Sequence, residues 1–188
     1  MVTPTISIMD RAGATRTPRA AGDCLRYRLD VIATSAADVV QSAGGWLFDR
    51  VMAGWQVTVL LPQRCDSRSL RIIGAEISGL ESFDPAAARC RSLAVSAEAF
   101  AADARTRDKV LESLDDRLTE VALWGEGWPI GVNRAMTRAQ YELSAAARTF
   151  KAQALSAAGI DCATIASTEA LLCDAAFTLG PEVVRLDR

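Results

Sequence analysis

A strand–helix–strand pattern between residues 25 and 62 limits the fold more than any other feature of the sequence. Apolar and charged residues alternate in residues 25–31, the period of two expected for a strand with one solvated face. The run WQVTVLLP, residues 55–62, is apolar enough for a buried strand. Residues 36–53 between them have the spacing of a helix. This order of elements predicts a right-handed βαβ unit with two parallel strands.

A pair of glycines, Gly44 and Gly45, lies in the middle of the helix predicted at 36–53. On a helical wheel the apolar residues of this segment fall within an arc of about 140°: Val39, Val40, Ala43, Trp46, Leu47 and Val51. Two interior glycines cost about 1 kcal/mol each, whereas burial of each large apolar side chain returns roughly 1.5 to 3 kcal/mol. We therefore expect one continuous helix ending at Gly54, in which the pair marks a close approach by another segment. A phosphate cradle would need its glycines between a strand and a helix N-terminus.

Beyond this unit the sequence predicts two more strands and a helical C-terminal half. The strands are residues 69–75 and 92–96. The helices are residues 106–123, residues 137–159 with a T-x-x-Q capping box at Thr137, and residues 167–179. Residues 119–124 can also be argued as a strand, but the helical spacing before them favours a helix.

The expected fold class is therefore α/β, with α+β as the alternative. The expected architecture is a small mixed sheet of three to four strands built on a βαβ unit, with helices packed on it and a helical C-terminal half. Residues 1–22 lack apolar periodicity, so we expect a disordered N-terminal tail followed by a single domain over residues 23–188.

The absence of histidine is the compositional fact that most restricts chemistry. Without histidine the chain lacks the commonest general base and the commonest metal ligand, so Ser-His-Asp hydrolysis, Cys-His proteolysis and histidine-ligated zinc are excluded within one chain. The five cysteines form no C-x-x-C, and the chain contains no phosphate-loop, dinucleotide or serine-hydrolase fingerprint. We expect no metal and no cofactor.

Charge and hydropathy set the expected environment. The 21 basic and 23 acidic residues give a formal net charge of −2, so nucleic acid is not an expected partner. No window approaches the roughly 18 to 20 apolar residues that span a bilayer, and the N-terminus lacks the order of a secretory signal. The sequence predicts a cytoplasmic protein with no membrane partner.

Three arginines near the end of the second predicted strand form the first candidate site. Arg64, Arg68 and Arg71 lie in the segment QRCDSRSLR, and arginine forks suit phosphate or carboxylate. Ligands of open α/β sheets collect outside the carboxyl ends of the parallel strands, where Arg64 and Arg68 are expected. A polar hairpin between two strands explains the same residues. Cys65 is a conceivable nucleophile, but it lacks a base.

The segment WGEGWPIG, residues 124–131, is the second candidate. It brings Trp124, Glu126 and Trp128 together between glycines, as a contact loop would, although tryptophans beside a turn also fold back over the core. The helix predicted at 137–159 carries Phe150 in an alanine-rich stripe, which suits close packing against a second copy of the protein or against the chain's own elements. The acidic run on the helix predicted at 106–123 fits a solvated face, and nothing in its spacing favours a metal-binding pair.

Two functional hypotheses follow. The leading one is a non-catalytic interaction or regulatory module, with a protein partner or a homodimer formed through the alanine-rich helix. Trp124, Trp128 and Phe150 are its expected contact residues. The alternative is an enzyme or binding protein for a small anionic ligand that carries phosphate or carboxylate, held by Arg64, Arg68, Arg71 and Glu126. No residue is identified as catalytic.

Overall fold

The computed structural model describes residues 27–62, 67–83, 91–116, 119–161, 163–174 and 183–185. Its strands are β1 Arg28–Ile32, β2 Gln56–Leu61, β3 Glu76–Gly79, β4 Arg91–Ser96, β5 Val121–Trp124, β6 Thr137–Glu142, β7 Thr168–Cys173 and β8 Val183–Arg185. Its α-helices are α1 Ala36–Met52, α2 Arg68–Ile72, α3 Ala97–Ala102, α4 Ala104–Asp116, α5 Ile130–Ala135 and α6 Ala145–Ala157, and a 3₁₀ turn, η2, covers Leu80–Ser82.

These described strands form one eight-stranded mixed sheet in the order β3-β2-β1-β4-β5-β7-β6-β8. The first five in this order run parallel, and β7, β6 and β8 continue the sheet with antiparallel pairs. The α/β class predicted from the sequence is confirmed. The predicted strand count of three to four is wrong, because five of the eight described strands come from segments that the sequence did not predict as strands.

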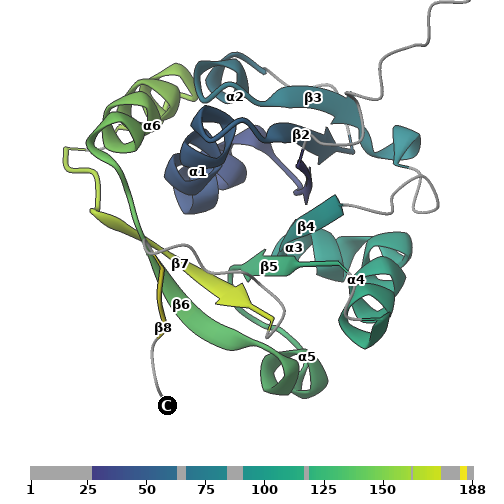
Figure 1. Cartoon of the computed structure of the whole chain (residues 1–188). Helices are drawn as coiled ribbons and strands as arrows, with labels where there is room; N and C mark the ends of the chain where they lie inside the picture. The colour runs from purple at the N-terminus through teal and green to yellow at the C-terminus, as the bar shows by residue number, and fades with distance from the viewer. Residues whose placement is uncertain are drawn as a thin grey trace, which may run out of the picture.

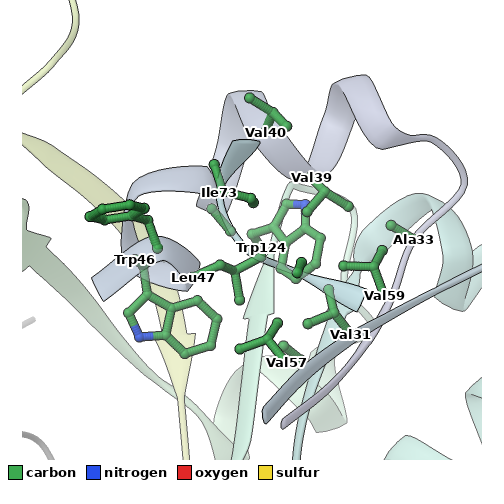
Figure 2. Close-up of a cluster of buried hydrophobic side chains, with 14 of the residues drawn as sticks. Val31, Ala33, Val39, Val40, Trp46, Leu47, Val57, Val59, Ile73 and Trp124 are labelled. Atoms are coloured by element: carbon green, nitrogen blue, oxygen red, sulfur yellow. The ribbon is translucent and has the colours of Figure 1, made fainter. Parts of the chain in front are cut away.

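Helices cover both faces of the sheet. Helices α1, α2 and α6 pack together on one face, and α3 and α4 lie on the other (Figure 1). In Figure 2, Val39 and Leu47 of α1 lie against Val31 and Val59 of the strands. A second cluster of buried apolar residues packs Ile32 and other strand residues against the short helices α3 and α5. Among the helices described, none is long and apolar enough to cross a membrane.

The N-terminal βαβ unit is as predicted. β1 and β2 pair in parallel, and α1 runs unbroken from Ala36 to Met52 through both glycines. Ser35 caps its first turn, because the Ser35 hydroxyl accepts the amide of Asp38 at 3.2 Å. Gly54 follows the helix with a φ of 89°, a left-handed conformation that favours glycine. The strand predicted at 92–96 is also confirmed, as β4.

Residues 69–75 are not a strand. They form α2 and the turn after it, because Leu70 and Ile73 have the i, i+3 spacing that buries both on one helical face. Residues 121–124 form β5, so the helix predicted at 106–123 ends at Asp116 and the strand alternative for this segment was right.

The predicted C-terminal helices need two further corrections. Residues 137–142 are β6, and α6 begins only after Ser144, whose hydroxyl accepts the amide of Ala147 at 3.0 Å. The capping box proposed at Thr137 does not exist. Residues 168–173 are β7, placed between β5 and β6. The predicted tail at residues 1–22 lies outside the described residues.

Candidate functional site

Polar side chains gather where parallel strands β1, β4 and β5 end. Thr34 follows β1, and its hydroxyl donates to a carboxylate oxygen of Glu98 at 2.7 Å. Ser96 ends β4 and caps α3, since its hydroxyl accepts the amide of Ala99 at 3.1 Å. Trp124 ends β5. This edge, at the carboxyl ends of the parallel strands, is where open α/β sheets bind ligands.

Asp38, in the first turn of α1, lies at this edge beside Trp124. Its carboxylate accepts the indole N–H of Trp124, at 3.1 Å from one oxygen and 3.3 Å from the other, and the hydroxyl of Ser42 at 3.2 Å. Partial burial raises the pKa of the Asp38 carboxyl, and the charge of Glu98 adds to the rise, while the bonds from Trp124 and Ser42 oppose it. Asp38 therefore holds a proton at a higher pH than an ordinary aspartate.

The raised pKa of Asp38 predicts the sign of a pH effect on stability. The folded state binds this proton more tightly than the unfolded state, so the free energy of unfolding should fall as pH rises from about 4 through the folded-state pKa. In Asp38→Asn this fall should become shallower, because the amide does not titrate. Denaturant unfolding between about pH 4 and pH 7 measures the slope.

Asp103 is the control for this experiment, because its pKa moves in the opposite direction. The hydroxyl and amide of Thr106 donate to its carboxylate at 2.7 and 2.8 Å and lower its pKa. Its stabilising contribution is present above the unfolded-state pKa and is lost as pH falls through the folded-state pKa. Asp103→Asn should therefore leave the Asp38 effect in place. An unchanged slope in Asp38→Asn would contradict the assignment.

A pocket of about 690 Å³ opens beside Trp124. We call it the Trp124 pocket. It lies among α1, the end of β5 with its following loop, β6 and β7, and it is lined by Gln41, Ser42, residues 123–128, Asn133, residues 138–140, Lys151, Ala166 and residues 168–172. Two indoles and several aliphatic side chains supply apolar wall, and the lining also includes amide and charged side chains.

A buried ion pair borders the Trp124 pocket. The ammonium of Lys151 donates to Glu169 at 2.5 Å and to the carbonyl oxygen of Gln41 at 2.7 Å. Both side chains are less than a tenth exposed. Burial raises the pKa of the Glu169 carboxyl, while the charge of Lys151 and the amides of Gly45 and Trp46 act in the opposite direction.

Gly45, one of the two glycines, has the packing role expected of the pair. The amides of Gly45 and Trp46 donate to the two carboxylate oxygens of Glu169 at 2.9 and 2.8 Å. A Cβ at Gly45 would lie 2.6 Å from a methyl of Leu143 and 3.2 Å from Glu169, whereas a Cβ at Gly44 would meet nothing closer than 3.4 Å. The helix stays continuous, and Gly45 is the position where β7 and the segment after β6 approach it.

The structure separates the predicted anion-binding residues. Arg64, like Cys65, lies outside the described residues. Arg68 and Arg71 lie on α2, not in the hairpin expected from the sequence, and neither lines the Trp124 pocket. Glu126 does line it.

The three predicted contact residues differ in how far they are exposed to solvent. Trp124 and Trp128 line the Trp124 pocket but are 2% and 7% exposed, as the core alternative expected. Phe150, on α6, is 43% exposed and stacks on Phe48 of α1 with ring centroids 4.6 Å apart. The buried face of α6 packs on the chain's own α1 and α2. Self-association stays a prediction.

Sequence reasoning did not identify Asp38, Arg138, Lys151 or Glu169. A signal existed for the ion pair, since Lys151 is one of only two lysines and shares the buried side of an alanine-rich helix with Ala147 and Ala154. Within the described ranges, no group of three histidine, cysteine, aspartate or glutamate side chains is arranged to hold a metal ion.

No protein-family model matches the chain, and no curated protein sequence matches it. Solved structures do. The A40926 pseudoaglycone deacetylase aligns over 87% of this chain and 99% of its own, with 18% identity and a TM-score of 0.50. A deacetylase–teicoplanin complex aligns over 86% and 100%, with 13% identity and a TM-score of 0.49, and a zinc-inhibited teicoplanin deacetylase over 85% and 99%, with 14% and 0.48. At 18% identity the likeness to the A40926 pseudoaglycone deacetylase shows a shared α/β fold alone.

The comparisons correct the leading functional hypothesis. The sequence predicted a non-catalytic interaction or regulatory module, but the A40926 pseudoaglycone deacetylase, which has a similar fold, is an enzyme. This likeness agrees better with the alternative hypothesis, an enzyme or binding protein for a small anionic ligand. The site for such a ligand has to be argued from this chain's own residues, because a fold alone does not carry a function.

Proposed function

We propose that the chain binds a small anionic molecule, carrying a phosphate or carboxylate, in the Trp124 pocket, as an enzyme or a ligand-binding protein. Arg138 is the observation that carries the proposal. It lines the pocket from β6, its side chain is exposed, and it has no hydrogen-bond or ion-pair partner among the residues that the structure describes. A guanidinium offers a planar fork of donors that matches phosphate and carboxylate oxygens.

The shape and position of the pocket support this proposal. Its volume of about 690 Å³ lies within the range of about 300–1,000 Å³ that is common for small-molecule sites. Gln41 and Gln140 add amide groups to the lining, and Trp124 and Trp128 add apolar wall for the body of a ligand. The pocket also adjoins the carboxyl ends of the parallel strands.

Asp38 does not line the pocket, but its carboxyl is hydrogen-bonded to Trp124 and Ser42, which do. Burial raises the pKa of this carboxyl. A carboxyl group with a raised pKa can serve as a general acid or base. Because the A40926 pseudoaglycone deacetylase has a similar fold, removal of an acyl group is the first activity to assay.

A binding screen with one arginine variant tests the proposal. Sugar phosphates, nucleotides and small carboxylates are screened by thermal shift, and hits are measured by calorimetry. Loss of a charged hydrogen bond costs about 1.5–3 kcal/mol, so Arg138→Gln should weaken a hit by about 10- to 100-fold. Arg148→Gln is the matched control, since Arg148 is an exposed arginine on α6 that does not line the pocket.

Two results would contradict this function. One is a screen in which no anion binds. The other is an affinity that Arg138→Gln leaves unchanged. If Arg68→Gln weakens binding instead, the ligand lies beside α2, where the sequence had predicted an anion site.

A further inference from the structure

We propose that the ligand of the Trp124 pocket is a zwitterion: a small molecule that carries an ammonium group as well as its phosphate or carboxylate. This inference rests on the proposed function and narrows its ligand class. Its basis is a second exposed charge in the same lining. Glu126 also has no hydrogen-bond or ion-pair partner among the described residues, and its charge is opposite to that of Arg138.

Four charged side chains line the pocket. Lys151 and Glu169 are bonded to each other and buried, so they present little net charge to a ligand. Arg138 and Glu126 are the two charged residues of the lining that this ion pair does not include. A ligand with only an anionic group satisfies Arg138 but leaves Glu126 uncompensated, and a ligand with only a cationic group does the reverse. A zwitterion pairs with both.

Glu126 is held at the pocket by an anchored loop. Its neighbours Gly125 and Gly127 both have left-handed φ angles, 86° and 88°. The indole N–H of Trp128 donates to the carbonyl of Gly125 at 3.2 Å, and the Trp128 ring packs against Phe100 with centroids 4.9 Å apart. The backbone of the turn that carries Glu126 is therefore anchored to the core, which keeps its carboxylate at this part of the pocket.

The two unpaired charges come from different elements of the lining. Glu126 follows β5 and Arg138 lies on β6, so the ammonium of a ligand should face the loop after β5. Arg138, on β6, is left for the anionic end of the ligand.

Pairs of compounds that differ only in the amino group test the inference. Phenylalanine is compared with 3-phenylpropionate, and O-phosphoethanolamine with ethyl phosphate, by calorimetry on the full chain. In each pair the amino compound should bind about three- to tenfold more tightly, the range of a partly exposed ion pair with one hydrogen bond. Glu126→Gln should remove this preference and leave the affinity for 3-phenylpropionate and ethyl phosphate unchanged. Arg138→Gln should weaken all four.

The outcomes separate the two proposals. If both members of a pair bind equally and Arg138→Gln weakens both, the anion site stands and the zwitterion is wrong. If none of the four compounds binds although another anion of the wider screen does, the anion site stands and the inference fails; if no anion binds at all, both fail. A preference for the amino compound that persists in Glu126→Gln also contradicts the inference, because another group would then hold the ammonium.

Discussion

Lys151→Met is expected to lower the free energy of unfolding by about 3–5 kcal/mol. The substitution keeps most of the aliphatic length but removes the ammonium that faces Glu169 at 2.5 Å. The Glu169 carboxylate, 2% exposed as a side chain, then stays buried without its counter-ion. Denaturant titration at pH 7 measures the loss.

Lys109 supplies the control, since it is the other lysine of the chain. It pairs with Glu112 at 3.0 Å on the surface of α4, and Glu112 is 66% exposed. Lys109→Met should change the free energy of unfolding by less than about 1 kcal/mol. Adding Glu169→Gln to Lys151→Met should recover part of the loss, because no charge is then buried alone. A double variant as unstable as Lys151→Met would refute this explanation.

The second large effect is expected at the glycine pair. Gly45→Ala should destabilise the protein by about 1–3 kcal/mol, the usual cost of overpacking. The new methyl would lie 2.6 and 2.7 Å from the two end carbons of Leu143, which is buried, and 3.2 Å from Glu169. Leu143 is 5% exposed, so its methyls can move only by displacing their packed neighbours. Thermal unfolding and denaturant titration measure the change.

Gly44→Ala is the matched variant, one residue away in the same helix. Its Cβ would meet Val40 at 3.4 Å, an ordinary contact, and alanine is favoured over glycine in a helix interior by about 1 kcal/mol. Gly44→Ala should therefore be neutral or stabilising. Equal effects of the two substitutions would mean that helix propensity, and not the approach of Leu143 and Glu169, decides the role of the pair.

The N-terminal βαβ unit could be predicted because its signals are local. The apolar stripe of α1, with Val39, Val40 and Leu47 fully buried, follows directly from residue spacing. The antiparallel strands β6, β7 and β8 could not be predicted in this way. β7 has the sequence TEALLC, which is rich in good helix formers, and it becomes a strand because it pairs with both β5 and β6. These pairings depend on residues distant in the sequence.

Part of the candidate site could also be predicted from the sequence. Trp124, Glu126 and Trp128 stand between glycines in one short segment, and this composition is typical of a contact loop. Asp38 and Arg138 look like ordinary polar residues of a helix and a strand in the sequence. They gain significance only when the sheet order brings β5, β6 and α1 around one pocket.

The bonds from Glu169 to α1 have a consequence for the order in which this protein can fold. They join residues separated by 123 and 124 positions, so they raise the mean sequence separation of native contacts, a quantity that correlates with slow folding. During synthesis, α1 and its strands emerge long before β7 exists. The amides of Gly45 and Trp46 gain their carboxylate acceptor only after residue 169 has been made, so this part of the core cannot be completed before β7 has emerged.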